Sequence, residues 1–308
     1  MAANFTLPTL SASRAWRFAT LAIMYSAQGL PFGLFNIAIP SWMAAGGYGA
    51  AEVASFIGIV SLPWSLKLIV APLMDRWGYR PMGYRRPWVI GAQLGVFLSF
   101  VIFGFIPEEL LWLSAVGCQT NIFAATQDVA VDGLAIDILP EQDRSRANGF
   151  MFGGQYVGIS LGASGGGYAL LHLGLQGVSL LSALLMILVL MFPILLLERS
   201  GERRFPWSAG KTSPRSALTT STGELVKNTV KALIVPASII LLLAQVGSRV
   251  AEGIIVSHLP IYAAQTMGLD DTTYNDFSTI GGILAAVLGV AISPWFDKIG
   301  SHKGFWFT

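Results

Sequence analysis

The sequence predicts an all-α protein, a polytopic bundle of transmembrane helices. Only 12% of its 308 residues are charged and 54% are hydrophobic, whereas a soluble domain carries about 25% charged residues. A surface with so little charge is expected to face lipid over much of its area. Two further observations support this prediction. The chain contains a series of apolar stretches of membrane-spanning length, and its Lys and Arg residues fall on one side of them.

Eight apolar stretches are long enough to cross a bilayer as helices. A hydrocarbon core about 30 Å thick needs about 20 helical residues. The short alternating segments that are typical of outer-membrane barrels do not occur in the sequence. The predicted spans are residues 16–43, 51–74, 88–106, 110–138, 147–171, 174–197, 232–264 and 274–296. A ninth span is expected to begin at Phe305, where the sequence soon ends.

The placement of positive charge predicts the orientation of the chain. Of the 19 Lys and Arg residues, two precede the first span and four follow the second. Two more follow the fourth span, seven follow the sixth and two follow the eighth, which makes 17 on one side. Because Lys and Arg accumulate in cytoplasmic loops, we expect a multi-pass inner-membrane protein with a cytoplasmic N-terminus. The remaining two, Lys67 and Arg249, lie inside predicted spans.

The predicted spans form two blocks. Residues 1–197 hold six closely connected spans, residues 198–231 have the composition of a flexible cytoplasmic linker, and residues 232–308 hold the rest. The motif Asp75-Arg76 after the second span recurs as Asp297-Lys298 after the eighth. A repeat at six spans predicts two homologous six-helix halves, with about eight complete helices of twelve in this chain. A protein of eight helices is the alternative.

Three of the spans carry polar side chains at spacings of three and four residues, which place them on one helical face. Polar groups in lipid are costly and by default face the bundle interior or a water-filled cavity. We therefore expect these stripes to line a pathway for a solute or for protons. The stripes are Tyr25, Gln28, Phe32 and Asn36 in the first span, Asn121, Ala125, Asp128 and Asp132 in the fourth, and Gln245, Arg249 and Glu252 in the seventh.

Depth along the helices predicts one ion pair. Lys67 lies eight residues before Asp75, and Asp128 lies nine residues before Asp137. With a rise of 1.5 Å per residue, both side chains are about 12–14 Å from the same side of the bilayer. If the second and fourth spans are neighbours, Lys67 and Asp128 are expected to pair.

Other charged residues are expected to form a network at the cytoplasmic ends of the helices. This predicted gate contains Asp75, Arg76, Arg85, Arg86 and Asp137, with Asp132 close to it.

Arg249 and Glu252 are three residues apart and are expected to pair within their helix. Together with Lys67 and Asp128, these groups could bind substrate or carry a proton. The alternative is that they only hold one conformation of the bundle.

The fifth span carries a glycine every fourth residue. Such a ridge lets a neighbouring helix approach closely, so we expect a packing role for Gly154, Gly158, Gly162 and Gly166. The sequence has no phosphate-binding Gly-rich loop, no metal-ligand spacing of Cys and His, and no nucleophile elbow. We therefore expect no enzyme activity, metal or cofactor, and no nucleic-acid partner. The expected partners are the lipid bilayer, a small-molecule solute and protons.

Two segments resemble a known family. APLMDR at 71–76, followed by GYRRPW at 83–88, resembles the loop after the second helix in the muropeptide permease family. ATQDVAVDG at 125–133, followed by Asp137 and LP at 139–140, resembles a fourth-helix signature that these permeases share with the acetyl-CoA transporters. Both branches belong to the peptide/acetyl-CoA transporter group of the major facilitator superfamily. QGLP at 28–31 and LPW at 62–64 are also similar to that group.

The resemblance implies a major facilitator fold in which the first, fourth, seventh and tenth helices line a central cavity. It also implies secondary active transport, by proton symport, of an anhydro-muropeptide or a related cell-wall fragment into the cell. Asp128 would carry the proton or hold Lys67, and Arg249 would meet an anionic group of the substrate. The alternatives are a transporter of acetyl-CoA or another organic anion, and a non-transporting assembly protein, sensor or inactive fragment.

Overall fold

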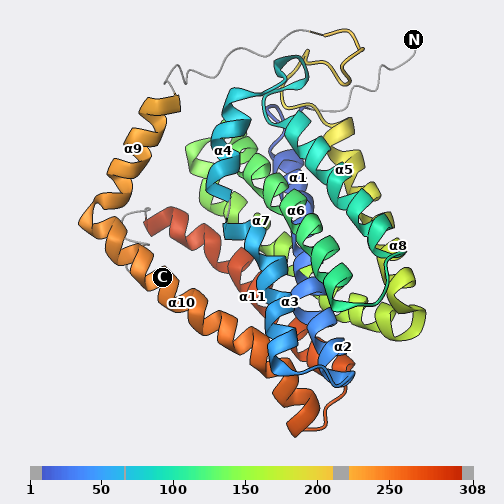
Figure 1. Cartoon of the computed structure of the whole chain (residues 1–308). Coiled ribbons are helices and arrows are strands. Elements are labelled where there is room, and N and C mark those ends of the chain that lie inside the picture. Colours follow the sequence, from blue (N-terminus) through green and yellow to red (C-terminus); the bar gives the residue numbers. More distant parts are fainter. Residues whose placement is uncertain (1–8, 66, 211–221, 300–308) are drawn as a thin grey trace.

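The computed structural model describes residues 9–65, 67–210 and 222–299. Regular structure in these ranges consists of helices that run side by side, with the early helices in one bundle and the later ones against it (Figure 1). The predicted ninth span at Phe305 lies outside the described residues. The side chains of Asp297 and Lys298 are also outside the description, although their backbone is helical.

The first two predicted spans are each built from consecutive helical segments. The first comprises α1 (Arg14–Gly33), a π-helical turn (Leu34–Ala38) and α2 (Ile39–Ala45). The second comprises α3 (Ala50–Ser65) and α4 (Lys67–Arg76). These bounds agree with the predicted ranges 16–43 and 51–74 to within a few residues.

The next four spans follow with short connections. The third and fourth are α5 (Arg86–Phe103) and α6 (Leu110–Ile138). The fifth is α7 (Arg144–Ser160) with a π-helical turn (Leu161–Gly165) and the start of α8 (Gly166–Leu195). The remainder of α8 is the sixth span.

The division between the fifth and sixth spans lies inside α8. Gly174 has φ 66° and ψ −172°, a backbone conformation that is essentially restricted to glycine. The helical path therefore breaks at this residue, directly after the predicted boundary at 172–173.

The later helices begin earlier in the chain than predicted. The structure has α9 (Thr222–Ile234), α10 (Pro236–Ile261), a π-helical turn (Tyr262–Thr266) and α11 (Asp271–Ile299). The last part of the predicted linker is thus helical. The predicted span 232–264 is interrupted at Val235, which is extended (φ −60°, ψ 134°). The cause is Pro236, because a proline disfavours the helical conformation of the residue before it.

Six helical segments in the described residues are long and apolar enough to cross a membrane. One of them, residues 141–195, contains the fifth predicted span and all but the last two residues of the sixth. The helix α6 has the predicted length but is not among the six, because its Asn, Gln, Thr and Asp side chains lower its mean hydropathy. The side chains that lower the hydropathy of α6 include Asn121, Asp128 and Asp132 of its predicted polar stripe.

The early helices pack into a bundle around α1 and α6. Helix α1 lies against α6 and α7, α5 lies between α6 and α8, and α3 lies against α6. Helix α11 runs along α7, while α10 contacts α2 and α3 (Figure 1). We call the end of the bundle that carries residues 76–86 and 139–146 the basic end. The end that carries residues 46–49 and 267–270 is the opposite end.

The predicted glycine ridge brings α7 into backbone contact with α1. A Cβ atom at Gly154, Gly158 or Gly162 would lie 2.0–2.2 Å from a carbonyl oxygen of α1, well inside van der Waals contact. The fourth predicted residue, Gly166, faces a side chain instead, since its Cβ would lie 2.9 Å from Cδ1 of Leu34.

The contact is reciprocal, which the sequence analysis did not predict. A Cβ at Gly29 or Gly33 of α1 would lie 2.1 Å from the carbonyl oxygen of Gln155 or Ile159 on α7. Small residues on both helices therefore set the distance between α1 and α7.

Candidate functional site

Lys67 and Asp128 form an ion pair between α4 and α6. The side chain of Asp128 is 6% exposed and that of Lys67 is 33% exposed. Depth along the two helices predicts this pairing, and the packing of α3 and α4 against α6 brings the two groups together. A buried carboxylate that keeps its charge needs such a partner.

Trp64 completes the surroundings of Lys67. The ammonium nitrogen lies 4.5 Å from the centroid of the Trp64 ring, which is a favourable cation–π distance. The indole Nε1 donates a hydrogen bond to Oδ1 of Asn121 (2.8 Å). The sequence analysis did not include Trp64 among the pathway residues, although its position three residues before Lys67 places both on one helical face.

A second polar contact joins α1 to α6. The hydroxyl of Tyr25 donates to Oδ1 of Asp132. Asp128 and Asp132 are four residues apart on α6 and therefore share one helical face, so the two contacts belong to one polar cluster. We call Tyr25, Lys67, Asp128 and Asp132 the central cluster. It connects three helices, α1, α4 and α6.

Amide side chains extend the polar surface along α1. The hydroxyl of Ser61 donates to Oδ1 of Asn36 (3.0 Å). Gln28 is fully buried, and neither amide atom has a hydrogen-bond partner among the described residues. Buried amides are normally paired. Gln28 therefore presents unused donors and acceptors inside the bundle.

The polar stripe of the seventh predicted span is described at one of its three residues. Gln245 on α10 is exposed. The side chains of Arg249 and Glu252 lie outside the described residues, so their predicted pairing remains a prediction.

Three residues of the predicted gate form one network at the basic end. Nη1 of Arg85 lies 2.9 Å from Oδ1 of Asp75, and its Nε lies 3.4 Å from Oδ2 of Asp137. The Arg85 guanidinium also lies 4.9 Å from the ring centroid of Tyr84. Gly133 leaves room for it, because a Cβ there would lie 2.7 Å from Nε of Arg85.

Arg76 and Arg86, which were predicted to join this gate, do not contact its carboxylates. Arg76 has an exposed side chain that lies 5.7 Å from the ring centroid of Trp77. Arg86 is 2% exposed and binds the backbone. Its guanidinium donates to five carbonyl oxygens, those of Met82, Pro193, Ile194, Arg203 and Arg204.

Glu198 binds the backbone at the start of α5, where Arg86 lies. Its carboxylate accepts the backbone N–H groups of Tyr84 (3.1 Å), Arg85 (3.0 Å) and Arg86 (2.6 Å). Gly83 provides the turn before them with φ 98°, and a Cβ there would lie 2.7 Å from the Glu198 carboxyl carbon. The start of the predicted linker is therefore packed.

Burial raises the pKa of Glu198 above its ordinary value of 4.5, and the neighbouring carboxylate of Glu202 adds to the shift. The three N–H groups act in the opposite direction but do not cancel the effect. Between the ordinary and the raised pKa, the folded protein binds more protons than the unfolded chain. This group's contribution to stability is therefore fully present below pH 4.5 and is lost as the pH rises through the raised pKa.

Glu198→Ala is expected to lower the thermal unfolding midpoint of the detergent-solubilised protein. The substitution leaves the buried Arg86 N–H without its acceptor, and an unsatisfied buried group costs about 1–3 kcal/mol. It should also remove the part of the fall in stability above pH 4.5 that Glu198 causes, because position 198 no longer carries an ionisable group. Melting curves between pH 4 and pH 8 measure both effects. An unchanged pH slope in the variant would show that Glu198 does not cause it.

At the opposite end, polar contacts connect early and late helices. The hydroxyls of Ser164 and Tyr168 donate to the two carboxylate oxygens of Asp276 on α11 (2.7 and 2.9 Å). Nε2 of Gln265 donates to the carbonyl oxygens of Ala44 (3.3 Å) and Tyr48 (3.2 Å). These residues tie α11 and the π-helical turn after α10 to the first part of the chain at this end.

The arrangement combines a buried acid–base pair in the middle of a helical bundle with an ion network at one end and interhelical hydrogen bonds at the other. A bundle of this kind is suited to moving a polar solute or a proton between two compartments. A family model described as Major Facilitator Superfamily matches residues 21–308. The chain belongs to the major facilitator superfamily, a family of multi-pass membrane transporters and not of enzymes.

The individual relatives share less than a third of their residues with this chain over the matched stretches. The chain is 29% identical over 177 residues to the anhydromuropeptide permease of Escherichia coli strain K12, a stretch that is 56% of this chain and 35% of the permease. It is 27% identical over 170 residues to an uncharacterised protein of Schizosaccharomyces pombe (52% and 31%). It is 29% identical over 181 residues to an uncharacterised membrane protein of Saccharomyces cerevisiae (47% and 30%). The matched stretches are about a third of the length of these relatives.

Proposed function

We propose that this chain is a proton-coupled secondary transporter that imports an anhydro-muropeptide or a related cell-wall fragment across the inner membrane. The observation that carries the proposal is the buried Lys67–Asp128 pair between α4 and α6, with Tyr25 and Asp132 beside it. Ionisable groups within a membrane bundle mark substrate and proton pathways. Residues 1–197 would form the first half, 198–231 the linker, and 232–308 part of the second half.

Protonation of Asp128 offers a coupling step. A neutral carboxyl group no longer attracts Lys67, so proton uptake would release the ammonium group towards a substrate carboxylate or carbonyl. The cation–π contact with Trp64 keeps the released side chain near the pathway. Loss of the proton would restore the ion pair and favour release of the substrate.

We propose that the basic end faces the cytoplasm, as its arginines indicate. The hydrogen bonds of Asp276 and Gln265 tie early and late helices at the opposite end. In the proposed orientation, these contacts close the described part of the bundle on its outer side. Transport would then require those outer contacts to break as one part of the bundle rocks against the other.

Similarity to the anhydromuropeptide permease and the polar groups of the pathway support this choice of substrate class. Gln28, Asn36 and Asn121 are amides that suit the hydroxyl, amide and carbonyl groups of a sugar–peptide. An anion as highly charged as acetyl-CoA would need several cations. Lys67 is the cation of the central cluster, and it is already paired with Asp128.

The test is uptake of radiolabelled anhydro-muropeptide into proteoliposomes that contain the purified chain. An imposed inward proton gradient is expected to drive accumulation, and a protonophore should abolish it. Labelled acetyl-CoA in parallel vesicles tests the organic-anion alternative. Uptake of acetyl-CoA alone would replace the substrate, while no uptake of either compound by a well-folded chain would favour a non-transporting role.

A further inference from the structure

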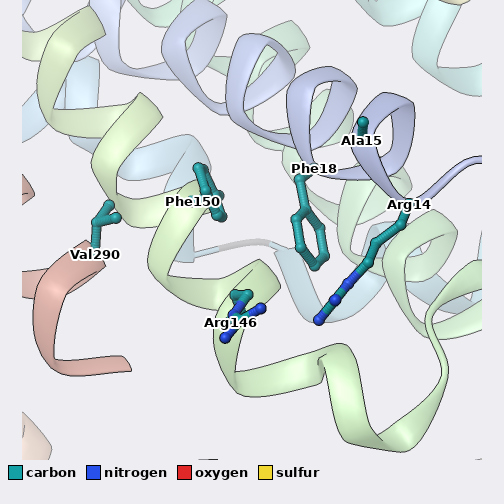
Figure 2. Close-up of a pocket in the computed structure, with 6 residues that line it drawn as sticks. All are labelled: Arg14, Ala15, Phe18, Arg146, Phe150 and Val290. Atoms are coloured by element: carbon teal, nitrogen blue, oxygen red, sulfur yellow. The ribbon is translucent and has the colours of Figure 1, made fainter. Parts of the chain in front are cut away.

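A pocket of about 480 Å³ lies at the basic end between α1, α7 and α11. Its lining consists of Arg14, Ala15, Phe18, Arg146, Phe150 and Val290. Figure 2 shows the side chains of Arg14 and Arg146 on the same side of the pocket, with Val290 across from them on α11. The pocket is separate from the central cluster, and the proposed transport function does not use it.

The walls of the pocket are apolar below an arginine rim. The rings of Phe18 and Phe150 are stacked with centroids 5.3 Å apart. The guanidinium of Arg14 lies 5.4 Å from the centroid of the Phe18 ring. One helical turn separates these two residues, which corresponds to about 6 Å along the axis. That length is similar to the thickness of one headgroup layer, about 5–7 Å.

The rim carries more positive than negative charge. Two helix N-termini, those of α1 and α7, meet here, and neither has an acidic residue in its first turn. An anion is favourable at such a terminus, and a cation is not. Three arginines stand against one carboxylate, a difference of two charges, namely Arg14, Arg17 and Arg146 against Asp143. The exposed side chains of Arg144 and Glu141 lie outside the pocket lining and offset each other.

Asp143 neutralises only part of this charge. It forms ion pairs with Arg14 (Nη2 to Oδ1, 2.7 Å) and with Arg17 (Nη2 to Oδ2, 3.5 Å). Arg17 also donates to the carbonyl oxygens of Leu10 and Ser11. Arg146 is half-buried and forms no ion pair with a described carboxylate. A further anion at the rim would complete the charge balance on Arg14 and Arg146.

We propose that this pocket binds an anionic phospholipid, with the phosphate on Arg14 and Arg146 and an acyl chain along Phe18, Phe150 and Val290. Basic pockets between helices on the cytoplasmic side of a membrane are suited to such headgroups. A free phosphate would use only the arginine rim, whereas a phospholipid matches both the rim and the apolar wall. Because Val290 belongs to α11, the bound lipid would join the early helices to the late ones and stabilise this arrangement.

The experiment measures the thermal unfolding midpoint of the purified chain in neutral detergent. Added dioleoyl-phosphatidylglycerol is expected to raise the midpoint by about 2–4 °C, since a ligand that binds only the folded state stabilises it. Dioleoyl-phosphatidylcholine and inorganic phosphate should each give less than a third of that shift. An equal shift with inorganic phosphate would identify a free-anion site and overturn the lipid assignment.

Arg146→Gln should reduce the phosphatidylglycerol shift at least threefold, and Arg146→Lys should keep most of it. Phe150→Ala should also reduce the shift, because it shortens the apolar wall. The matched control is Arg144→Gln, which removes the same charge from an exposed residue outside the pocket lining and should keep the full shift. If Arg144→Gln and Arg146→Gln lost the shift equally, general surface charge would explain the effect and the pocket would not.

Discussion

Gly158→Ala is expected to destabilise the protein far more than an alanine substitution at a neighbouring helical glycine. A Cβ at Gly158 would lie 2.0 Å from the carbonyl oxygen of Ser26. This neighbour is backbone and cannot turn away as a flexible side chain can. Helices α1 and α7 would have to separate along their length, and overpacking of this kind costs about 1–3 kcal/mol or more.

Gly165→Ala is the matched control in the same span. A Cβ there meets nothing within 4 Å, and its helical φ of −60° suits alanine. This substitution should be neutral or stabilise the protein by about 0.5–1 kcal/mol, because glycine is the more flexible residue in the unfolded chain. Thermal unfolding in detergent and the yield of monodisperse protein measure the difference. Equal stability of the two variants would contradict the close approach of α1 and α7.

Breaking the Lys67–Asp128 pair is expected to destabilise the protein, and the loss of stability should depend on which of the two residues is replaced. Lys67→Gln leaves a carboxylate that is 6% exposed without a partner, whereas Asp128→Asn leaves an ammonium group that is 33% exposed and lies beside Trp64. Removing one partner of a buried pair costs about 3–5 kcal/mol. We expect Lys67→Gln to approach this range and Asp128→Asn to fall below it.

The double variant Lys67→Gln with Asp128→Asn separates a structural role from a coupling role. Neither member of the pair is left as an unpaired charge, so the stability of the double variant should exceed that of Lys67→Gln. If Asp128 carries the coupled proton, the double variant should lose gradient-driven uptake at least tenfold but still exchange labelled for unlabelled substrate. Glu108→Gln, at an exposed loop carboxylate, is the control and should transport as the wild type does. Full gradient-driven uptake by the double variant would show that the pair is only structural.

The sequence predicted well those features that depend on position along a helix. Because each residue advances a helix by a constant 1.5 Å, the lengths of the early spans and the equal depth of Lys67 and Asp128 could be read from spacing alone. The one-sided distribution of Lys and Arg follows from local composition in the same way. The spacing of Gly154, Gly158 and Gly162 also predicted a packing face, though it did not identify the helix against which this face lies.

Only the tertiary structure decided which groups meet across helices. Arg85, Arg86 and Glu198 show the reason. Neighbouring arginines in one loop have opposite roles, since Arg85 binds two carboxylates and Arg86 is buried on backbone carbonyls. Glu198 follows the sixth span and was assigned to a flexible linker, but it folds back onto a segment more than a hundred residues earlier. Local spacing sets the depth and the face of a side chain, whereas its partner depends on how separate helices rotate and pack against one another.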